Sequence, residues 1–128
     1  MDLERAKASL SASRLCLEQQ LFDSAASRAY FAMFQAAVCA LESRGIQRSE
    51  WSHKGVHSDF VQNFVRRRKI VPASFAGALP SVMQIRHNAD YRQPGASQRQ
   101  AERAVRLARE FLDLLMKEVL NASEKENT

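Results

Sequence analysis

Apolar side chains recur every three or four positions along most of this chain, and that spacing limits the folds it can adopt more than any other feature. An α-helix brings residues three and four apart onto one face, whereas a β-strand would need apolar residues at every second position. The clearest stripe lies within residues 22–44 and consists of Ala26, Ala29, Tyr30, Met33, Phe34, Ala37 and Leu41. The sequence therefore predicts an all-α protein with a long helix over these residues.

Four other segments show the same periodicity. We predict helices over residues 2–20, over about fifteen residues from 53, over 73–92 and over 97–120. The connections between these segments are short, which favours antiparallel packing of neighbouring helices. The prediction is one domain, an up-and-down helical bundle of about five helices over residues 1–120, followed by a frayed tail at 121–128.

Local signals mark several of the predicted helix ends. Gly45 is placed to end the second helix in a left-handed conformation, and Ser52 is placed to cap the start of the third. Pro72 opens the fourth helix, because proline is accepted in a first turn. Pro80 falls inside that helix, where a lost hydrogen bond and a steric clash cost about 3 kcal/mol. We therefore expect a kink, or a break into two segments, near Leu79.

The composition argues against a membrane-spanning or secreted protein. No run of eighteen apolar residues is present, and the N-terminus carries charge from its second residue. Cys16 and Cys39 lie inside helical patterns rather than in a spaced disulfide framework. These observations predict a cytoplasmic protein with two buried thiols and no membrane partner.

Positive charge is concentrated in the middle of the chain. Residues 44–106 carry twelve Lys and Arg against four Asp and Glu, a net charge of +8, whereas the whole chain carries +5. Fourteen of the nineteen cationic residues are arginine, whose planar guanidinium suits phosphate. This pattern predicts a polyanionic partner, but it does not separate RNA from DNA or from an acidic protein.

Two groups of cationic residues are candidate contacts for such a partner. The alternative for each group is an ordinary solvated face of a helix. One is a cluster at the end of the third predicted helix, and the other is a stripe along the last: Arg66, Arg67, Arg68 and Lys69, and then Arg99, Arg103 and Arg106.

The stretch QIRHNADYR, residues 84–92, carries the best candidate site of the chain. On a helix, Arg86 and Asp90 lie four residues apart and share a face. His87 and Tyr91 share the neighbouring face by the same spacing. The stretch therefore offers a guanidinium, an imidazole, a carboxylate and a phenol within little more than one helical turn.

In a functional interpretation these side chains divide the work of a catalytic site. Arg86 would hold a phosphate, and His87 would transfer protons, since the ordinary pKa of histidine is near 6.5. Asp90 would orient the site, and Tyr91 would stack on a base or form a hydrogen bond. The alternative is an ordinary helical ion pair beside a solvated histidine.

Three segments of the chain, in this order, carry a family resemblance. They are SRAYFAMFQAAVCALESRG at 27–45, SHKGVHSDFVQNFVRRRKIVP at 52–72 and QIRHNADYR at 84–92. The first two resemble the first half of the HEPN domain superfamily. The third resembles the Arg-x-x-Ala-Asp-Tyr signature of a branch of small HEPN proteins that are often encoded beside a nucleotidyltransferase. The likeness runs from about Leu17 to Arg92, and the order of helices extends it to the C-terminus.

This resemblance implies a helical bundle that pairs as a homodimer. In catalytic HEPN domains, an Arg and a His separated by four to six residues meet their symmetry mates in a cleft and cut RNA without a metal. The ribose 2′-hydroxyl attacks the adjacent phosphate, the Arg stabilises the charge and the His handles protons. Many members are toxins that a nucleotidyltransferase antitoxin silences. The resemblance thus implies RNA and an antitoxin as partners, with no metal and no cofactor.

The chain departs from that pattern after Arg86. Four to six intervening residues lead to Tyr91, Arg92 and Gln93, and the nearest imidazole, His87, is adjacent and about 100° around the helix. Two hypotheses remain. One is a toxin-like protein that binds or cleaves RNA at a dimer cleft, as a metal-independent endoribonuclease. The other is a non-catalytic adaptor that binds a nucleotidyltransferase partner or a nucleotide.

Arg28 and Tyr30 are predicted to support the site. They lie in the first family-like segment, on a helix face that is otherwise apolar and aromatic. Because an unpaired charge is costly to desolvate, Arg28 is expected to reach Asp90 or Tyr91 on the fourth helix. The alternative is that Arg28 extends outward into solvent.

His53 and His57 lie four residues apart, a spacing that suits two ligands of one metal ion. No Cys or carboxylate stands at a matching position, and Lys54 replaces the glutamate of a zinc-protease motif. The sequence therefore favours helix capping and surface contacts for the two histidines over a metal site.

Overall fold

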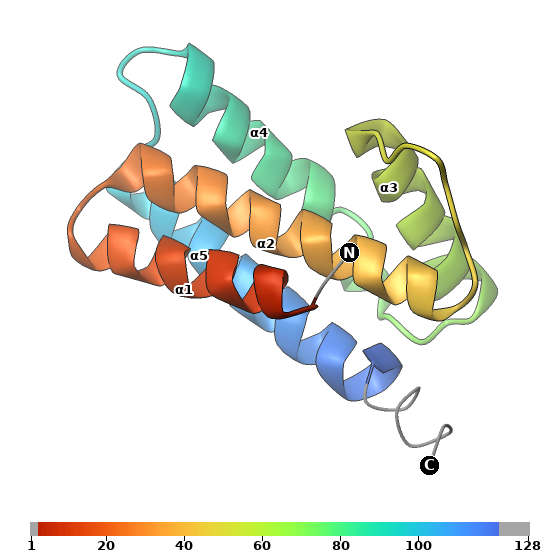
Figure 1. Ribbon diagram of the computed structural model, residues 1–128. Coiled ribbons are helices and arrows are strands. Elements are labelled where there is room, and N and C mark those ends of the chain that lie inside the picture. Colours follow the sequence, from red (N-terminus) through yellow and green to blue (C-terminus); the bar gives the residue numbers. More distant parts are fainter. Residues whose placement is uncertain (1–2, 121–128) are drawn as a thin grey trace.

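The computed structural model describes residues 3–120, and within that range all regular structure is helical (Figure 1). The five α-helices are α1 (Leu3–Glu18), α2 (Phe22–Ser43), α3 (His53–Phe60), α4 (Ala78–Tyr91) and α5 (Gln98–Leu115). Wider π-helical turns continue α3 over Val61–Arg67 and α5 over Met116–Leu120, and a 3-10 turn at Ala73–Phe75 precedes α4. The prediction of an all-α bundle of about five helices is confirmed. The predicted tail at 121–128 lies outside the described residues.

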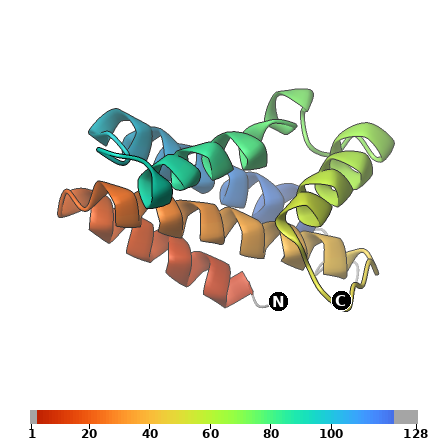
Figure 2. The ribbon, with the colours of Figure 1, turned by 90° about the horizontal axis from the view of Figure 1, so that it is seen from above.

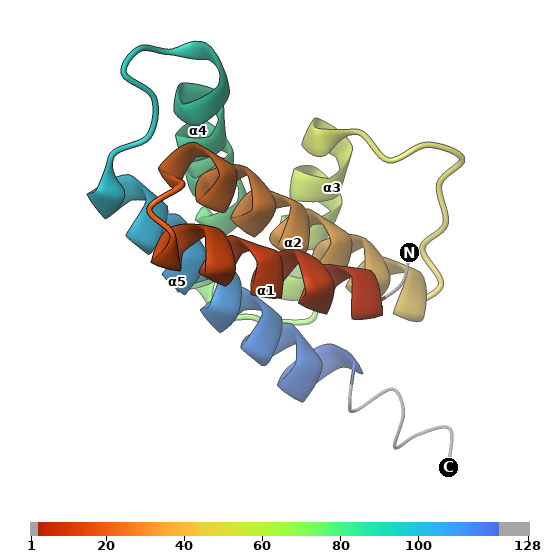
Figure 3. The same cartoon turned by 60° about the vertical axis from the view of Figure 1, so that its left-hand side comes forward.

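Helix α2 is the centre of the bundle. It contacts α1, α3, α4 and α5, and Figures 1 and 2 show it lying between α1 on one side and α4 on the other. Figure 3 shows α3 crossing α2 at a steep angle rather than running along it. Small residues on several faces of α2 let these neighbours approach closely; the buried alanines are Ala25, Ala26, Ala29, Ala32, Ala36, Ala37 and Ala40.

The last helix packs its apolar face inward. Six of its apolar residues recur at helical spacing in the sequence, which predicts that they face the core, and all six are buried: Ala101, Val105, Ala108, Leu112, Leu115 and Val119. Phe111 is also fully buried. Its ring centroid lies 5.0 Å from that of Phe60, the last residue of α3. No helix within residues 3–120 has the length and apolarity that a membrane span requires.

Two of the predicted helix ends are formed as expected. Gly45 has φ +82°, and the N–H of Ile46 donates to the carbonyl of Leu41 at 3.1 Å, which closes α2 with a left-handed turn. At the start of α3, the hydroxyl of Ser52 accepts a hydrogen bond of 2.9 Å from the N–H of Gly55. This cap fixes where α3 begins.

The predicted fourth helix consists of two segments, which is one of the two alternatives expected near Pro80. The break lies before Leu79, where the expected break was placed: the 3-10 turn ends at Phe75, and α4 begins at Ala78, directly after Gly77. The predicted interior position of Pro80 was therefore wrong, because Pro80 is the third residue of α4. In the first turn of a helix the backbone N–H has no partner within the helix, so proline loses no hydrogen bond.

The connection between α4 and α5 is tied to the start of α2. The N–H of Ala96 donates to the carboxylate of Asp23 at 2.8 Å. Gly95 has φ +93°, and a Cβ atom there would lie 2.6 Å from Asp23 Oδ1. Both the backbone conformation and the approach of Asp23 therefore require glycine at position 95.

We predict that Gly95→Ala destabilises the fold by about 1–3 kcal/mol, because alanine resists this conformation and displaces Asp23. Gly77→Ala is the matched control: Gly77 has φ −95° and no atom within 4 Å of an added Cβ. Its expected change is about half a kcal/mol or less. Urea unfolding of the two variants measures the difference, and equal stabilities would contradict the role given to Asp23.

Candidate functional site

Arg86 and Asp90 form an ion pair on α4, as their spacing predicted. Arg86 Nε lies 3.4 Å from Asp90 Oδ2, and the two side chains are 20% and 32% exposed. The other carboxylate oxygen of Asp90 accepts a hydrogen bond of 3.0 Å from the hydroxyl of Ser27 on α2. Asp90 therefore links α4 to α2 while it neutralises part of the charge of Arg86.

The guanidinium of Arg86 rests on two aromatic rings of α2. Its Cζ atom lies 4.8 Å from the ring centroid of Phe31 and 5.5 Å from that of Tyr30, distances at which a cation is attracted to a ring face. The contact with Asp90 lacks hydrogen-bond geometry, and the buried Nε–H of Arg86 has no hydrogen-bond partner among residues 3–120. Stacking and charge thus hold the guanidinium in place without a hydrogen bond from Nε, and a planar guanidinium suits an anion.

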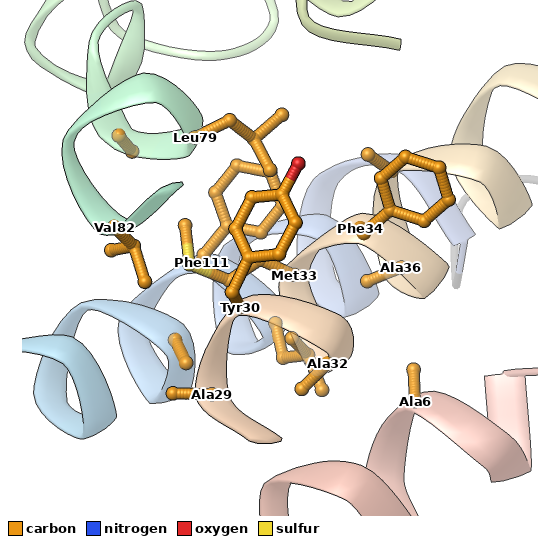
Figure 4. Packing of buried hydrophobic residues seen from close by; sticks show 14 of the residues in the cluster. Ala6, Ala29, Tyr30, Ala32, Met33, Phe34, Ala36, Leu79, Val82 and Phe111 are labelled. Atoms are coloured by element: carbon orange, nitrogen blue, oxygen red, sulfur yellow. The ribbon is translucent and has the colours of Figure 1, made fainter. Parts of the chain in front are cut away.

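Tyr30 connects this arginine to the two histidines of α3. Its hydroxyl lies 2.8 Å from His53 Nδ1 and 2.8 Å from His57 Nε2. Figure 4 shows the ring of Tyr30 on α2, with Leu79 and Val82 of α4 on one side and Phe34 on the other. Burial raises the pKa of Tyr30 to about 12, and the charge of Arg86 lowers it by a smaller amount. The neutral hydroxyl therefore donates to one imidazole and accepts from the other.

Both imidazoles of this cluster favour the neutral form. Burial lowers the pKa of His53, and the nearby charge of Arg86 lowers it further. Burial also lowers the pKa of His57, with a second contribution from His53. At neutral pH the two side chains therefore serve as hydrogen-bonding groups and proton acceptors rather than as cations.

These pKa values predict that the fold loses stability in mild acid. In the unfolded chain His53 and His57 regain an ordinary pKa near 6.5 and bind protons that the folded protein does not bind. The free energy of unfolding should therefore fall as the pH drops through about 6.5, and level off below the folded pKa values. Urea unfolding at neutral pH and at about pH 5.5 measures the loss. The double variant His53→Gln/His57→Gln should lose less; an equal loss would contradict the prediction.

One cavity gathers the candidate residues. Its volume is about 220 Å³, and it is lined by His53, Met83, Arg86, His87, Asp90 and Tyr91. The four catalytic candidates of the 84–92 stretch thus share one cavity, together with a histidine from α3. The rings of His87 and Tyr91 pack at 5.1 Å, as expected for neighbours on one face, and Tyr91 is 74% exposed. The cavity is smaller than the roughly 300–1,000 Å³ of most small-molecule sites, which favours one group of a larger ligand.

Arg28 does not take the predicted place. It is exposed on α2, and it forms no ion pair with Asp90 and no hydrogen bond with Tyr91 in the described range. Ser27, one residue earlier, contacts Asp90 instead. The alternative of an arginine that extends into solvent holds, although Arg28 and Asp90 both line a neighbouring cavity of about 360 Å³.

The predicted cationic contacts are exposed, and none of them lines the cavity of Arg86. The cluster at 66–69 lies at the far end of the third helical segment from His53. The stripe on α5 faces solvent, opposite the buried residues of that helix. Both groups therefore remain surfaces on which a polyanion could lie.

The sequence did not reveal His53, His57 and Phe31 as neighbours of the site. The first two were weighed as metal ligands, yet no group of three or more His, Cys, Asp or Glu within residues 3–120 is arranged to hold a metal ion. The available signal was Tyr30: a tyrosine hydroxyl on a buried helix face needs a polar partner. Two histidines on one face of the next helix are suitable partners.

Comparison with known proteins agrees with this architecture. Residues 2–119 match the HEPN domain family. The UPF0332 protein glr0978 of Gloeobacter violaceus is 29% identical over 116 residues, which cover 89% of this chain and 90% of that protein. A Methanocaldococcus jannaschii protein named "Putative toxin MJ0605" is 28% identical over 115 residues, 90% of this chain and 84% of that protein. The family match spans nearly the whole helical bundle, and the chain belongs to the HEPN domain family.

Proposed function

We propose that this HEPN protein is toxin-like and cleaves RNA as a metal-independent endoribonuclease, at the cavity that contains Arg86. The observation that carries the proposal is that one cavity is lined by a guanidinium, whose Nε–H has no hydrogen-bond partner among the described residues, and by two imidazoles. The name of the archaeal relative supports the toxin-like role. The net charge of +8 over residues 44–106 supports a polyanionic substrate.

The residues of the cavity take distinct roles in this proposal. Arg86 holds the scissile phosphate and stabilises the charge that develops on it during the reaction. His87 transfers a proton, and Asp90 keeps the arginine in position. Tyr91, which is largely exposed at the rim, stacks on a base of the RNA.

The cationic surfaces extend the proposed RNA path beyond the cavity. The residues concerned are Arg66, Arg67, Arg68, Lys69, Arg99, Arg103 and Arg106, all exposed. Contacts of this kind position the phosphate backbone without selecting a sequence, and they weaken as salt concentration rises.

A homodimer is part of the proposal. Phe31 and Tyr91 are 37% and 74% exposed beside the guanidinium of Arg86, an unusual position for large aromatic side chains. Pairing of two copies over this face would bring their cavities together into one groove. A single copy offers only about 220 Å³ at this site.

A non-catalytic adaptor is the second candidate function. Arg86 already faces Asp90, and no histidine follows it after four to six intervening residues. In this alternative the same surface binds a nucleotidyltransferase antitoxin or a nucleotide and cuts nothing. The two functions differ in turnover, because only the endoribonuclease cleaves RNA.

Incubation of the purified protein with end-labelled RNA in the presence of a metal chelator separates the candidates. The endoribonuclease predicts fragments from the unaltered protein and none from the double variant Arg86→Ala/His87→Ala. Salt-sensitive binding of the RNA without any cleavage fragments would favour the adaptor. Fragments of equal yield from both proteins would point to a contaminating nuclease and overturn the proposal.

A further inference from the structure

We propose that His53 of α3 is the second catalytic imidazole of this cavity, and that it takes the proton from the attacking 2′-hydroxyl while His87 protonates the leaving oxygen. The inference rests on the proposed RNA cleavage and names a residue that lies outside the 84–92 stretch. It also supplies a base that the stretch lacks, because its only histidine is His87.

The position of His53 suits contact with a substrate. It is the first residue of α3, directly after the Ser52 cap, and it lines the cavity beside Arg86. Its ring packs against Tyr30 and Phe34, with centroids 5.4 Å and 5.1 Å away. Only its Nδ1 atom is engaged by the described residues, which leaves Nε2 for a group bound in the cavity.

Tyr30 and His57 position that imidazole and select its tautomer. In the arrangement that provides a base, His53 Nδ1–H donates to the Tyr30 oxygen, and the Tyr30 hydroxyl donates to His57 Nε2. The lone pair of His53 then lies on Nε2. Such a partner at the distal nitrogen is the usual way in which proteins fix the orientation and tautomer of a working histidine.

The surrounding charges keep this imidazole neutral. The groups that face it are Tyr30 from α2, His57 from α3 and, from α4, the cavity residues Arg86, His87, Asp90 and Tyr91. Burial and the charge of Arg86 lower the pKa of His53. A base must be unprotonated before it can act, and this environment supplies that form at neutral pH.

The proposed step balances without another reactant. His53 Nε2 accepts the proton of the 2′-hydroxyl as the 2′-oxygen forms a bond to phosphorus. The bond from phosphorus to the 5′-oxygen breaks, and protonated His87 donates a proton to that oxygen. The products are a 2′,3′-cyclic phosphate and a free 5′-hydroxyl. Proton exchange with water restores both histidines.

A chemical rescue experiment on the full-length protein tests the role of His53. His53→Ala should cleave a mixed-sequence RNA about a hundredfold more slowly than the unaltered protein. Added imidazole should raise the cleavage rate of this variant by about tenfold or more. Its affinity for a 2′-O-methyl RNA, which cannot be cleaved, should change by less than about threefold, because Arg86 holds the phosphate. Arg86→Ala is the control that imidazole should not rescue.

The pH profile tests the positioning role of Tyr30. Cleavage by the unaltered protein should fall in acid as His53 gains its proton, and this acidic limb should disappear in His53→Ala. Tyr30→Phe keeps the ring beneath Arg86 and removes the oxygen that accepts from His53 Nδ1–H. That hydrogen bond favours the protonated imidazole, so the acidic limb should move to lower pH, with a rate loss of about tenfold. Circular dichroism establishes that each variant is helical. If His53→Ala does not fold, His53→Gln takes its place.

Different results overturn the role of His53 and the endoribonuclease activity. Cleavage by His53→Ala at the rate of the unaltered protein overturns the role of His53 and leaves the endoribonuclease standing. A slow His53→Ala variant with an unchanged pH profile and no imidazole rescue also overturns it. An unaltered protein that leaves RNA intact overturns the endoribonuclease and, with it, the proton transfer by His53.

Discussion

Arg86→Ala is expected to lower RNA cleavage by about a thousandfold, the upper range for removing one group that stabilises transition-state charge. The fold should persist, because the ion pair with Asp90 is partly exposed and contributes only about 0–1 kcal/mol. Arg86→Lys should recover little activity. A lysine keeps the charge but lacks the planar group that stacks on Phe31 and Tyr30 and binds phosphate through two N–H groups.

Arg92→Ala is the charge-matched control for this experiment. Arg92 is exposed directly after α4 and does not line the cavity. Single-turnover cleavage rates and thermal melts of the three variants separate a local effect from a general loss of positive charge. Similar rate losses in Arg86→Ala and Arg92→Ala would contradict the role given to Arg86.

Phe111→Ala is expected to destabilise the fold by about 3–5 kcal/mol, the cost of removing a fully buried aromatic ring and leaving a cavity. Phe111 has no exposed surface, and its ring centroid lies 5.0 Å from that of Phe60, so this side chain joins α5 to α3. Domains of this size have free energies of unfolding of about 5–15 kcal/mol, so the variant should lose a large part of its stability.

Urea unfolding measures this loss against a matched surface change. Leu15 is 62% exposed on α1, and Leu15→Ala should alter the free energy of unfolding by about half a kcal/mol or less. A Phe111 variant that unfolds at the same urea concentration as the Leu15 variant would show that α5 and α3 are not joined through this ring.

The helices were predictable from the sequence because helical periodicity is local. The six residues of the last helix predicted to face inward are all buried, and the Ser52 cap and the Gly45 turn depend only on nearby residues. The start of α4 was not placed correctly. A helix that begins at Ala78 makes Pro80 harmless, and the sequence alone did not distinguish a first turn from an interior one.

The site was predictable only where its contacts lie within one helix. The pairs Arg86–Asp90 and His87–Tyr91 follow from a separation of four residues. The contact of Tyr30 with the α3 histidines depends on how α3 crosses α2, which no local pattern specifies. Ser27, not Arg28, contacts Asp90. Adjacent residues of a helix point about 100° apart, and the apolar stripe of α2 is too broad to show which of the two faces α4.

Photo-crosslinking tests the location of the RNA site most directly. A 2′-O-methyl RNA with a photoreactive base is irradiated with the unaltered protein, and the modified residues are mapped by mass spectrometry. The account predicts adducts on Tyr91 and on the peptides that contain His53 and His87, with fewer on the cluster at 66–69. Adducts confined to that cluster or to the α5 stripe, and none around the cavity, would contradict the assignment of this cavity as the place where RNA is processed.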